Sequence, residues 1–212
     1  MHWIIERHDW IDSTNDEAVR RALAGAVEGT VVVAEGQRSG RGQYGRVWES
    51  PHGSNLYVSL ILRPPLLPAA AQPLTLVTAV AVAEIIETVA SRHPDIGTSA
   101  HRHIGTKIKP PNDILIDGKK CAGILSEATI QGGVLKFVVV GIGVNVNATA
   151  SDFSPELRAQ ATSLRDVSGC EWNRAELLDG LLAAFATRYT QFLRDGFESM
   201  RAAYATFSAG CR

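Results

Sequence analysis

The residues with the clearest chemical potential lie in Gly40–Trp48, which reads GRGQYGRVW and follows neither helical nor strand periodicity. Its three glycines allow the backbone to approach a ligand closely, while Arg41 and Arg46 bring planar donors suited to carboxylates and phosphates. Trp48 offers a flat face on which a purine can stack. A segment that combines these residue types is suited to hold a small anionic molecule beside a nucleotide.

The same glycines match the dinucleotide-binding pattern GxGxxG, but the flanking sequence argues against that reading. The preceding run 30–35 indicates a strand, as the pattern requires. After the loop, however, 49–53 is a cluster of breakers and 54–62 indicates another strand rather than a helix. Because the pattern works only where its glycines end a strand and open a helix, a dinucleotide fold is disfavoured.

Four further segments place polar residues or glycines at the ends of apolar runs or within them. They are Ser13-Thr14-Asn15, the KPPND turn from Lys109, the KCAGILSE run from Lys120 and the VGIGVNVN run from Val140. A glycine inside a strand usually marks the close approach of a ligand or another backbone. We therefore expect these segments to meet the first one at a binding site.

Helices and strands intermix along the chain, with several hairpin signals. The pattern predicts strands at 3–7, 30–35, 54–63, 106–109, 114–116, 119–126 and 134–146, and helices at 14–23, 73–92, 173–194 and 197–207. Thr14 with Glu17 predicts a capping box, and Asp117-Gly118 is the favoured pair for a tight hairpin turn. This order favours an α+β fold with a mixed sheet backed by helices over a strict βαβ series.

Composition limits the class of protein. The chain has 212 residues, is 45% hydrophobic and 20% charged, and carries a formal charge of −1, as expected for one large globular domain or for one domain with a small appendage. Such a charge provides no basic field for nucleic acid and no polybasic membrane patch, so neither partner is expected. The longest apolar run, 74–89, contains Thr75, Thr78, Glu84 and Glu87 among its polar residues, which predicts a buried helix rather than a membrane span.

The cysteines and histidines add little chemistry. Three widely spaced cysteines fit a reducing cytosol better than a disulfide framework, and the charged start of the chain does not resemble a signal peptide, so we expect a cytoplasmic location. Cys121 lies on an apolar hairpin strand and is predicted to be a core residue. His101 and His103 have no third ligand nearby in sequence, and no metal site is predicted for them.

In order and spacing, the five segments resemble the biotin–protein ligases of the bacterial type. The matching patterns are STN, GRGxxGRxW, KxPND, KxxGIL and GIGxNVN, and they cover residues 13–147. Glycine-rich loops are common, but five such segments in family order are specific. The resemblance implies a catalytic domain over residues 1–207 and a short tail at 208–212. Its fold would be a largely antiparallel central sheet backed by helices, similar to class II aminoacyl-tRNA synthetases.

The resemblance implies a reaction in two steps. Biotin and ATP with Mg²⁺ give biotinyl-5′-AMP and pyrophosphate, and the biotinyl group then moves to one lysine of the biotin carboxyl carrier domain of acetyl-CoA carboxylase. The first step brings two anions, a carboxylate and an α-phosphate, close together, so fixed positive charge is needed where negative charge develops. The family pattern assigns that part to Lys109 and Arg41. By the resemblance, Lys109 contacts the biotin carboxylate and then the phosphate, while Arg41 orders the loop over the intermediate.

The resemblance also assigns binding residues by position. The biotin set is Ser13, Thr14, Asn15, Gln37, Gly40, Arg41, Gly42, Gln43, Lys109 and Gly123. The ATP and adenylate set is Arg46, Trp48, Asn112 and Asn145, with Trp48 stacked on adenine and Asn145 at its edge. Taken singly, Ser13 and Thr14 also fit a simple helix cap, Trp48 a core position and Lys109 a solvated strand end.

The chain departs from the family pattern at two positions and at both ends. Gln43 stands where the family often has a basic residue, so we expect the adenylate to be held less tightly and to label bystander lysines. Pro110 stands where the family usually has tryptophan, so we expect one wall of the site to be smaller and stiffer, without loss of activity. The STN segment begins at residue 13, so no DNA-binding helix-turn-helix is expected. The sequence ends at Arg212, where many relatives continue into a small β-barrel domain, and both truncation and loss of that domain in this branch stay open.

Two other classes of function remain open at this point. A lipoate ligase or octanoyltransferase is thought to share the fold, but its linear acyl substrate does not need the polar pocket of Ser13, Thr14 and Gln37. A non-catalytic module that binds biotin or its adenylate is the second alternative, suggested by Gln43 and the short C-terminus. The resemblance also suggests a homodimer through the sheet edge, which the residues themselves do not establish.

Overall fold

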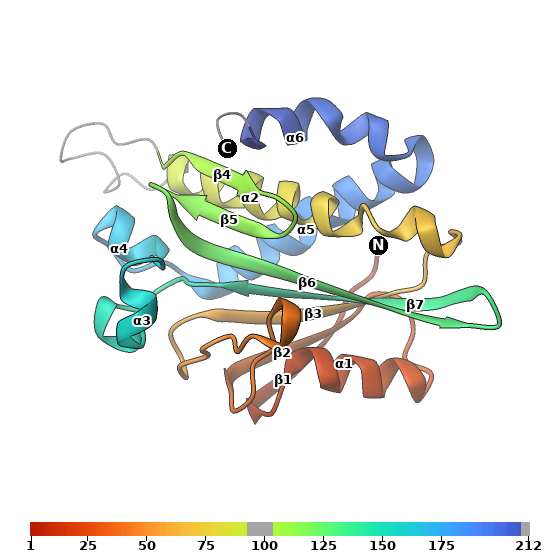
Figure 1. The fold of residues 1–212 in the computed structure, drawn as a ribbon, viewed down its shortest axis with the longest axis horizontal. Helices are drawn as coiled ribbons and strands as arrows, with labels where there is room; N and C mark the ends of the chain where they lie inside the picture. Colours follow the sequence, from red (N-terminus) through yellow and green to blue (C-terminus); the bar gives the residue numbers. More distant parts are fainter. Residues whose placement is uncertain (93–103, 209–212) are drawn as a thin grey trace. The chain divides into compact units, whose positions relative to one another are not determined.

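The computed structural model describes residues 1–92 and 104–208, and its described part is a mixed sheet backed by helices (Figure 1). The strand order is β1-β2-β3-β7-β6-β5-β4. The strands are β1 (Ile4–Ile11), β2 (Thr30–Gln37), β3 (Leu56–Leu62), β4 (Thr106–Lys109), β5 (Asp113–Ile116), β6 (Lys119–Gln131) and β7 (Val134–Val144). β1 runs parallel to β2, whereas the pairs β2–β3, β4–β5 and β5–β6 are antiparallel. The predicted fold class is confirmed.

The helices fall after β1, after β3 and in the C-terminal third of the chain. The α-helices are α1 (Thr14–Leu23), α2 (Leu74–Arg92), α3 (Pro155–Arg158), α4 (Leu164–Ser168), α5 (Arg174–Asp195) and α6 (Arg201–Ser208). Short 3₁₀ turns are η1 (Gln43–Gly45), η2 (Pro68–Ala71), η4 (Ala150–Asp152) and η5 (Phe197–Met200). The chain divides into two compact units, Met1–Thr75 with Ile124–Gly143 and Leu76–Gly123 with Val144–Arg212.

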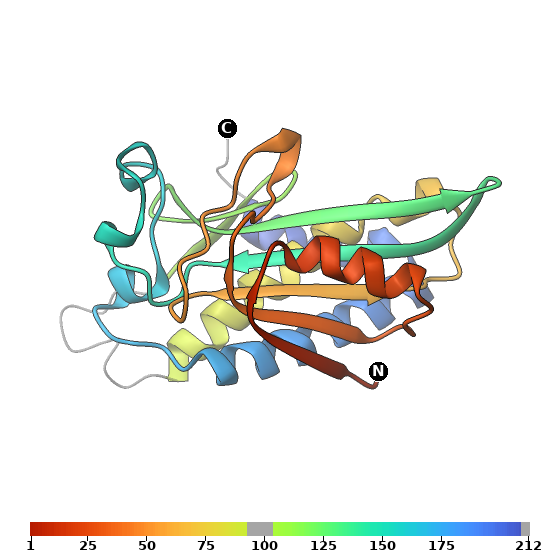
Figure 2. The same ribbon diagram turned by 90° about the horizontal axis from the view of Figure 1, so that it is seen from below.

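In the first unit, α1 lies along β2 and β3 (Figure 2). Its inner face carries Ala18 and Ala22, whose small side chains allow the helix to approach the sheet closely. They pack with Val32 of β2, Ile61 of β3 and Val139 of β7 in one buried cluster. Because these side chains share one face of the sheet, their burial fixes the N-terminus of α1 beside the ends of the strands.

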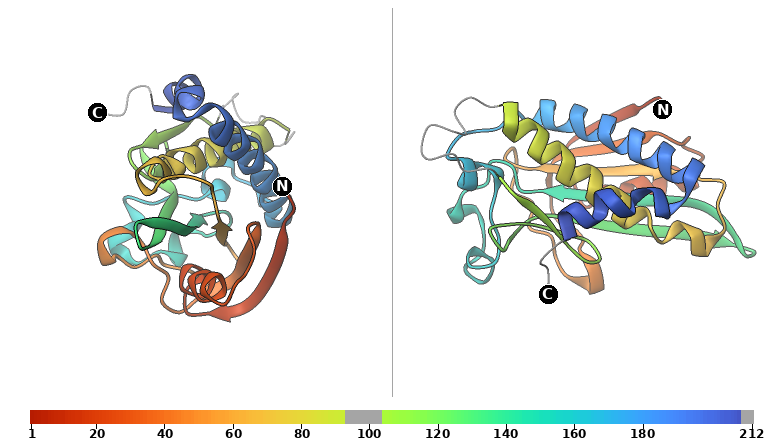
Figure 3. Two further views of the ribbon diagram at one scale, coloured as in Figure 1. Left: turned by 90° about the vertical axis from the view of Figure 1, so that its right-hand side faces the viewer. Right: turned by 90° about the horizontal axis from the view of Figure 1, so that it is seen from above.

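In the second unit, α2 and α5 lie side by side (Figure 3). Gly180 of α5 faces Ile85 of α2 so closely that any Cβ at position 180 would overlap the isoleucine side chain. An ion pair between Arg188 and Glu84 joins the same two helices. α6 packs against β4. The contact with α6 supports the strand that carries Lys109.

One helix in the described part of the chain, Pro68–Arg92, is long and apolar enough to cross a membrane by length and composition. Of the residues in its most apolar window, 67% are buried inside the structure. Residues such as Val77, Val80 and Ile86 are fully buried. The packing therefore accounts for the apolar run as a core helix, as the polar residues within the run predicted.

Several local predictions are confirmed and one is wrong. Asp117 and Gly118 have positive φ values of 52° and 78° and form the tight turn between β5 and β6. The predicted capping box at Thr14 is wrong, because the N-cap is Ser13, whose Oγ accepts a hydrogen bond from the Asp16 amide. Glu17 then lies one position too late and pairs with arginines of α1 instead. The His101 and His103 prediction lies outside the described residues.

The N-cap of α5, which the sequence placed at Asn173, can be tested directly by mutation. Asn173 accepts hydrogen bonds from the Ala175 and Glu176 amides at 3.0 and 3.2 Å. We expect Asn173→Ala to lower the free energy of unfolding by about 1 kcal/mol, since two amide donors of the first turn lose their acceptor. Asn173→Asp retains an acceptor and serves as the control in urea denaturation. Equal stability of the alanine variant and the parent would show that the cap contributes nothing.

Candidate functional site

The glycine-arginine segment of the first unit is a small hairpin. The Gly42 amide donates to Arg46 O at 2.7 Å and the Trp48 amide donates to Gly40 O at 2.9 Å. Its tip is the turn η1, where Tyr44 has a φ of 57° and is 90% exposed. A Cβ at position 40 would overlap the Trp48 carbonyl, so only glycine fits there. The sequence marked this segment as a loop and did not reveal that its backbone is paired.

Gln37 joins this hairpin to the start of α1. Its Oε1 accepts hydrogen bonds from the amide of Thr14 at 2.8 Å and from the hydroxyl of Thr14 at 3.1 Å. Its Nε2 donates to Ser50 Oγ at 2.8 Å, and Ser50 Oγ donates in turn to the carbonyl of Trp48 at 2.9 Å. The structure thus brings Thr14 and Gln37 together, as predicted, and shows that their side chains are oriented by each other before any ligand arrives.

Asn15 is buried and oriented from three strands. The residue is only 4% exposed, and its Oδ1 accepts a hydrogen bond from Ser59 Oγ of β3 at 2.6 Å. Its Nδ2 donates to Glu127 Oε2 at 2.8 Å and to the Leu125 carbonyl at 3.3 Å. On β7, a Cβ at Gly141 would overlap the carboxamide. Since both Nδ2 hydrogens bond to the protein, a ligand contact by Asn15 would have to use Oδ1.

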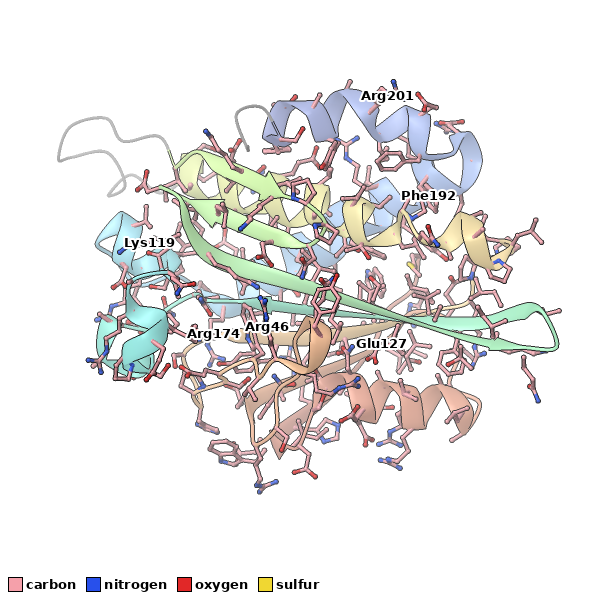
Figure 4. The ribbon with its side chains drawn as sticks, viewed as in Figure 1. Arg46, Lys119, Glu127, Arg174, Phe192 and Arg201 are labelled. Atoms are coloured by element: carbon pink, nitrogen blue, oxygen red, sulfur yellow. The ribbon has the colours of Figure 1, made fainter. Side chains whose placement is uncertain are left out.

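Arg41 is held by two acids of the same unit. Its guanidinium donates to Glu127 Oε1 at 2.6 Å and Oε2 at 3.1 Å, and to Asp16 Oδ1 at 2.5 Å. The hydrogen bonds that Arg41 donates to Glu127 are the main cause that raises the pKa of Arg41 above its ordinary value. Glu127 comes from β6, while Arg46 lies further along the loop that carries Arg41; both are labelled in Figure 4. Arg41 therefore docks the hairpin against α1 and β6.

Trp48 leaves the hairpin and lies against β7. A Cβ at Gly143 would come within 2.5 Å of the indole ring, so the absence of a side chain there makes room for the tryptophan. The residue itself is half-buried. One side of the indole is thus supported by backbone of β7, which is the arrangement that a stacking platform needs.

In the second unit, Lys109 is the exposed last residue of β4 and lies opposite Asp113 of β5. The turn Pro110–Asn112 joins the two strands and contains a cis peptide bond between the prolines. Asp113 faces Gly123 of β6 in register and pairs with Lys120 at 2.7 Å. Lys109, Asn112 and Gly123 therefore belong to one three-stranded edge, with the lysine at the exposed end of β4.

The asparagines of the GIGVNVN run act as internal ties within the second unit. Asn145 is 4% exposed, and its Nδ2 donates to the Thr162 carbonyl at 3.0 Å. Asn147 exchanges two hydrogen bonds of 2.9 Å with the backbone of Trp172. The predicted contact of Asn145 with adenine must therefore coexist with its bond to Thr162. Both side chains secure the chain that follows β7.

Cys121 is a core residue, as predicted. Its side chain is fully buried on β6, and its thiol donates to the Asn145 carbonyl at 3.5 Å. Burial raises the pKa of the Cys121 thiol well above its ordinary value. The residue therefore remains protonated and unreactive under physiological conditions.

Four residues of the first-unit network were not among the predicted site residues: Asp16, Ser50, Ser59 and Glu127. Ser59 is a single polar residue inside the apolar run LYVSLIL, and Glu127 closes the KCAGILSE run. A polar residue within a buried strand needs a hydrogen-bond partner, which was the available signal for Ser59. No local pattern identifies which partner that is.

Among the described residues, Glu6, His8 and Glu17 have ligand atoms within 4.8 Å of one another. Arg21 pairs with both glutamates, at 3.0 Å from Glu6 and 2.8 Å from Glu17. Arg20 pairs with Glu17 as well. Because these cations already neutralise the carboxylates, the cluster is an ion-pair network on β1 and α1 rather than a favourable metal site.

The comparison with known protein families is decisive. A model described as the biotin/lipoate A/B protein ligase family matches residues 8–145, more than half of the chain. The chain belongs to this family. The match contains the hairpin, the α1 network and the strand edge with Lys109, so the residues that the structure organises are those of the family domain.

Individual relatives agree. The bifunctional ligase/repressor BirA of Bacillus subtilis (strain 168) is 39% identical over 96% of this chain and 59% of its own length. The biotin–[acetyl-CoA-carboxylase] ligase of Paracoccus denitrificans is 35% identical over 93% of this chain and 78% of its own. The chain thus spans less than two-thirds of the BirA sequence and most of the Paracoccus enzyme.

Among solved structures, a biotin protein ligase from Aquifex aeolicus in complex with biotin and ATP aligns with a TM-score of 0.77 and 26% identity. The alignment covers 97% of this chain and 78% of the other. The seven-stranded sheet and its helices are therefore those of a biotin protein ligase catalytic domain.

Proposed function

We propose that this protein is a biotin–protein ligase. It joins biotin to AMP at the expense of ATP and transfers the biotinyl group to a lysine of a biotin carboxyl carrier domain of acetyl-CoA carboxylase. The observation that carries the proposal is the glycine hairpin docked on the polar N-terminus of α1 through Gln37 and Arg41. Curated relatives named as biotin ligases and a similar ligase structure with biotin and ATP support it.

The side chains proposed for the ureido ring and for stacking on adenine belong to the first unit, and the proposed cation belongs to the second. In the first unit, Ser13, Thr14 and Gln37 offer oriented hydroxyl and amide groups to the ureido ring of biotin. Trp48 offers its indole to adenine. In the second unit, Lys109 brings a mobile ammonium to the biotin carboxylate and then to the α-phosphate. No side-chain nucleophile is needed, because the attacking groups belong to the substrates.

The polar pocket favours biotin over a linear acyl acid. Thr14, Gln37 and Ser59 form a continuous hydrogen-bonded network beneath the hairpin. A saturated acyl chain has no N–H or C=O group with which this network could form a hydrogen bond. A ureido ring has both kinds of group. This network is the feature that argues against lipoate or octanoate as substrate.

The proposal includes further partners that rest on composition and resemblance. ATP would enter as its Mg²⁺ complex. The protein would act in the cytoplasm, on a carrier domain and without nucleic acid, and a homodimer through the sheet edge remains part of the proposal.

The proposed function is tested by acyl transfer to a carrier domain. Purified protein, Mg-ATP and the carrier domain are mixed in parallel with biotin, lipoate or octanoate, and the carrier mass is measured. We expect a mass gain with biotin alone, and none when the target lysine of the carrier is replaced. A gain with lipoate or octanoate would assign the protein to the other branch of the family. Tight biotin binding without any gain would favour a non-catalytic binding module.

A further inference from the structure

We propose that Glu127 is a positioning residue for the proposed reaction, and that Arg41 acts by docking the hairpin on Glu127 rather than by binding a substrate anion. The inference rests on the proposed function for its effect on biotin. The docking itself is a property of the protein alone and is tested separately.

Glu127 connects three elements through one carboxylate. Its Oε1 accepts from Arg41 at 2.6 Å, and its Oε2 accepts from Arg41 at 3.1 Å and from Asn15 Nδ2 at 2.8 Å. The side chain comes from β6, Arg41 from the hairpin and Asn15 from the first turn of α1. Two-point binding of a guanidinium fixes direction as well as distance, which a single hydrogen bond does not. Glu127 thereby sets where the hairpin lies relative to α1.

The charges of this cluster are incompatible with Arg41 as the main anion-binding group. One arginine faces two carboxylates, Glu127 and Asp16, so the three groups together carry a net charge of −1. Both hydrogens of one terminal nitrogen are directed at these acids, and the other terminal nitrogen donates to Glu127. An incoming biotin carboxylate or phosphate would meet a compensated guanidinium. The positive charge that the reaction requires must then come from another residue.

The two acids are not equivalent. The side chain of Asp16 is 56% exposed and makes one contact with Arg41, whereas that of Glu127 is 30% exposed and makes two. Exposed ion pairs contribute little, so Asp16 adds less to docking than Glu127 does. Asp16→Asn therefore provides a matched control. This substitution removes an acid that pairs with Arg41 and leaves the hydrogen bond between Asn15 and Glu127 in place.

Hydrogen exchange tests the docking without any substrate. We expect Glu127→Gln to raise the exchange rates of the Gly42 and Trp48 amides by roughly tenfold, while Asp16→Asn changes them by less than about twofold. Melting temperatures of both variants are measured alongside, and Glu127→Asp, which retains the charge, should give an intermediate rate. Unchanged exchange at Gly42 and Trp48 in Glu127→Gln would overturn the inference, whatever the protein's substrate.

A double-mutant cycle tests how Arg41 acts. We expect Arg41→Ala to weaken biotin binding by roughly tenfold in the parent but by less than about twofold in Glu127→Gln, because the contact through which it acts is already lost. Additive losses in calorimetry would mean that Arg41 contacts the ligand directly, and would overturn the inference. If the parent binds no biotin while Glu127→Gln still loosens the hairpin, the proposed function fails and the docking role stands.

Discussion

Replacing Lys109 with alanine is expected to lower the rate of biotinyl-AMP formation by about two to three orders of magnitude, the range typical for loss of one group that stabilises developing charge. The reason is that Arg41, the other candidate cation, is already paired with Glu127 and Asp16. Lys109 projects from the exposed end of β4 and contributes nothing to the buried core. The fold and the melting temperature should therefore remain those of the parent.

Lys107 offers a matched control for this prediction. It lies two residues earlier on β4, is exposed like Lys109, and has the same side chain on the same face of the strand. Pyrophosphate release with biotin and ATP should be nearly unchanged in Lys107→Ala and almost abolished in Lys109→Ala. Comparable rates in the two variants would remove Lys109 from the proposed mechanism. Lys109→Arg should recover only part of the rate, since a planar fork cannot follow the two anions as an ammonium does.

Local signals in the sequence predicted the fold well where structure depends on neighbours in the chain. Asp117-Gly118 forms the predicted turn because two consecutive residues with positive φ suit this pair. The helix start at residues 13–14 was found, but the cap was misplaced by one position. Ser13 and Thr14 are adjacent and both are good caps, and tertiary contacts decided between them by directing the Thr14 hydroxyl to Gln37.

The candidate site was predicted only in part, because its organisation depends on partners distant in sequence. Arg41 and Glu127 are separated by 86 residues, and Asn15 and Ser59 by 44. Nothing in a local pattern says that a carboxylate on one strand will neutralise an arginine on a distant loop. The sequence therefore indicated which residues matter and assigned Arg41 both to the reacting anions and to the ordering of its loop, but it did not identify the two acids that hold the guanidinium. The structure shows it as one member of a charged cluster.

Alanine at Gly143 is expected to lower kcat/KM for ATP by roughly tenfold or more while leaving the affinity for biotin within about twofold, the scale set by overpacking a tight contact. A Cβ there would lie 2.5 Å from the Trp48 indole, which would have to move. If Trp48 is the platform for adenine, its displacement affects the nucleotide first. Because the indole is rigid, the whole ring has to shift to relieve the overlap.

Gly141, on the same strand, allows the complementary substitution to be made. The same substitution there would drive a Cβ into the Asn15 carboxamide, which braces the N-terminus of α1 beside Thr14 and Gln37. We expect Gly141→Ala to weaken biotin binding and to affect KM for ATP less, the reverse of Gly143→Ala. Both variants remove no functional group, so a difference between them reports only which neighbour was displaced. Equal effects of both variants on both ligands would show that β7 acts as one rigid support, and the separate assignment of Trp48 to adenine and α1 to biotin would be lost.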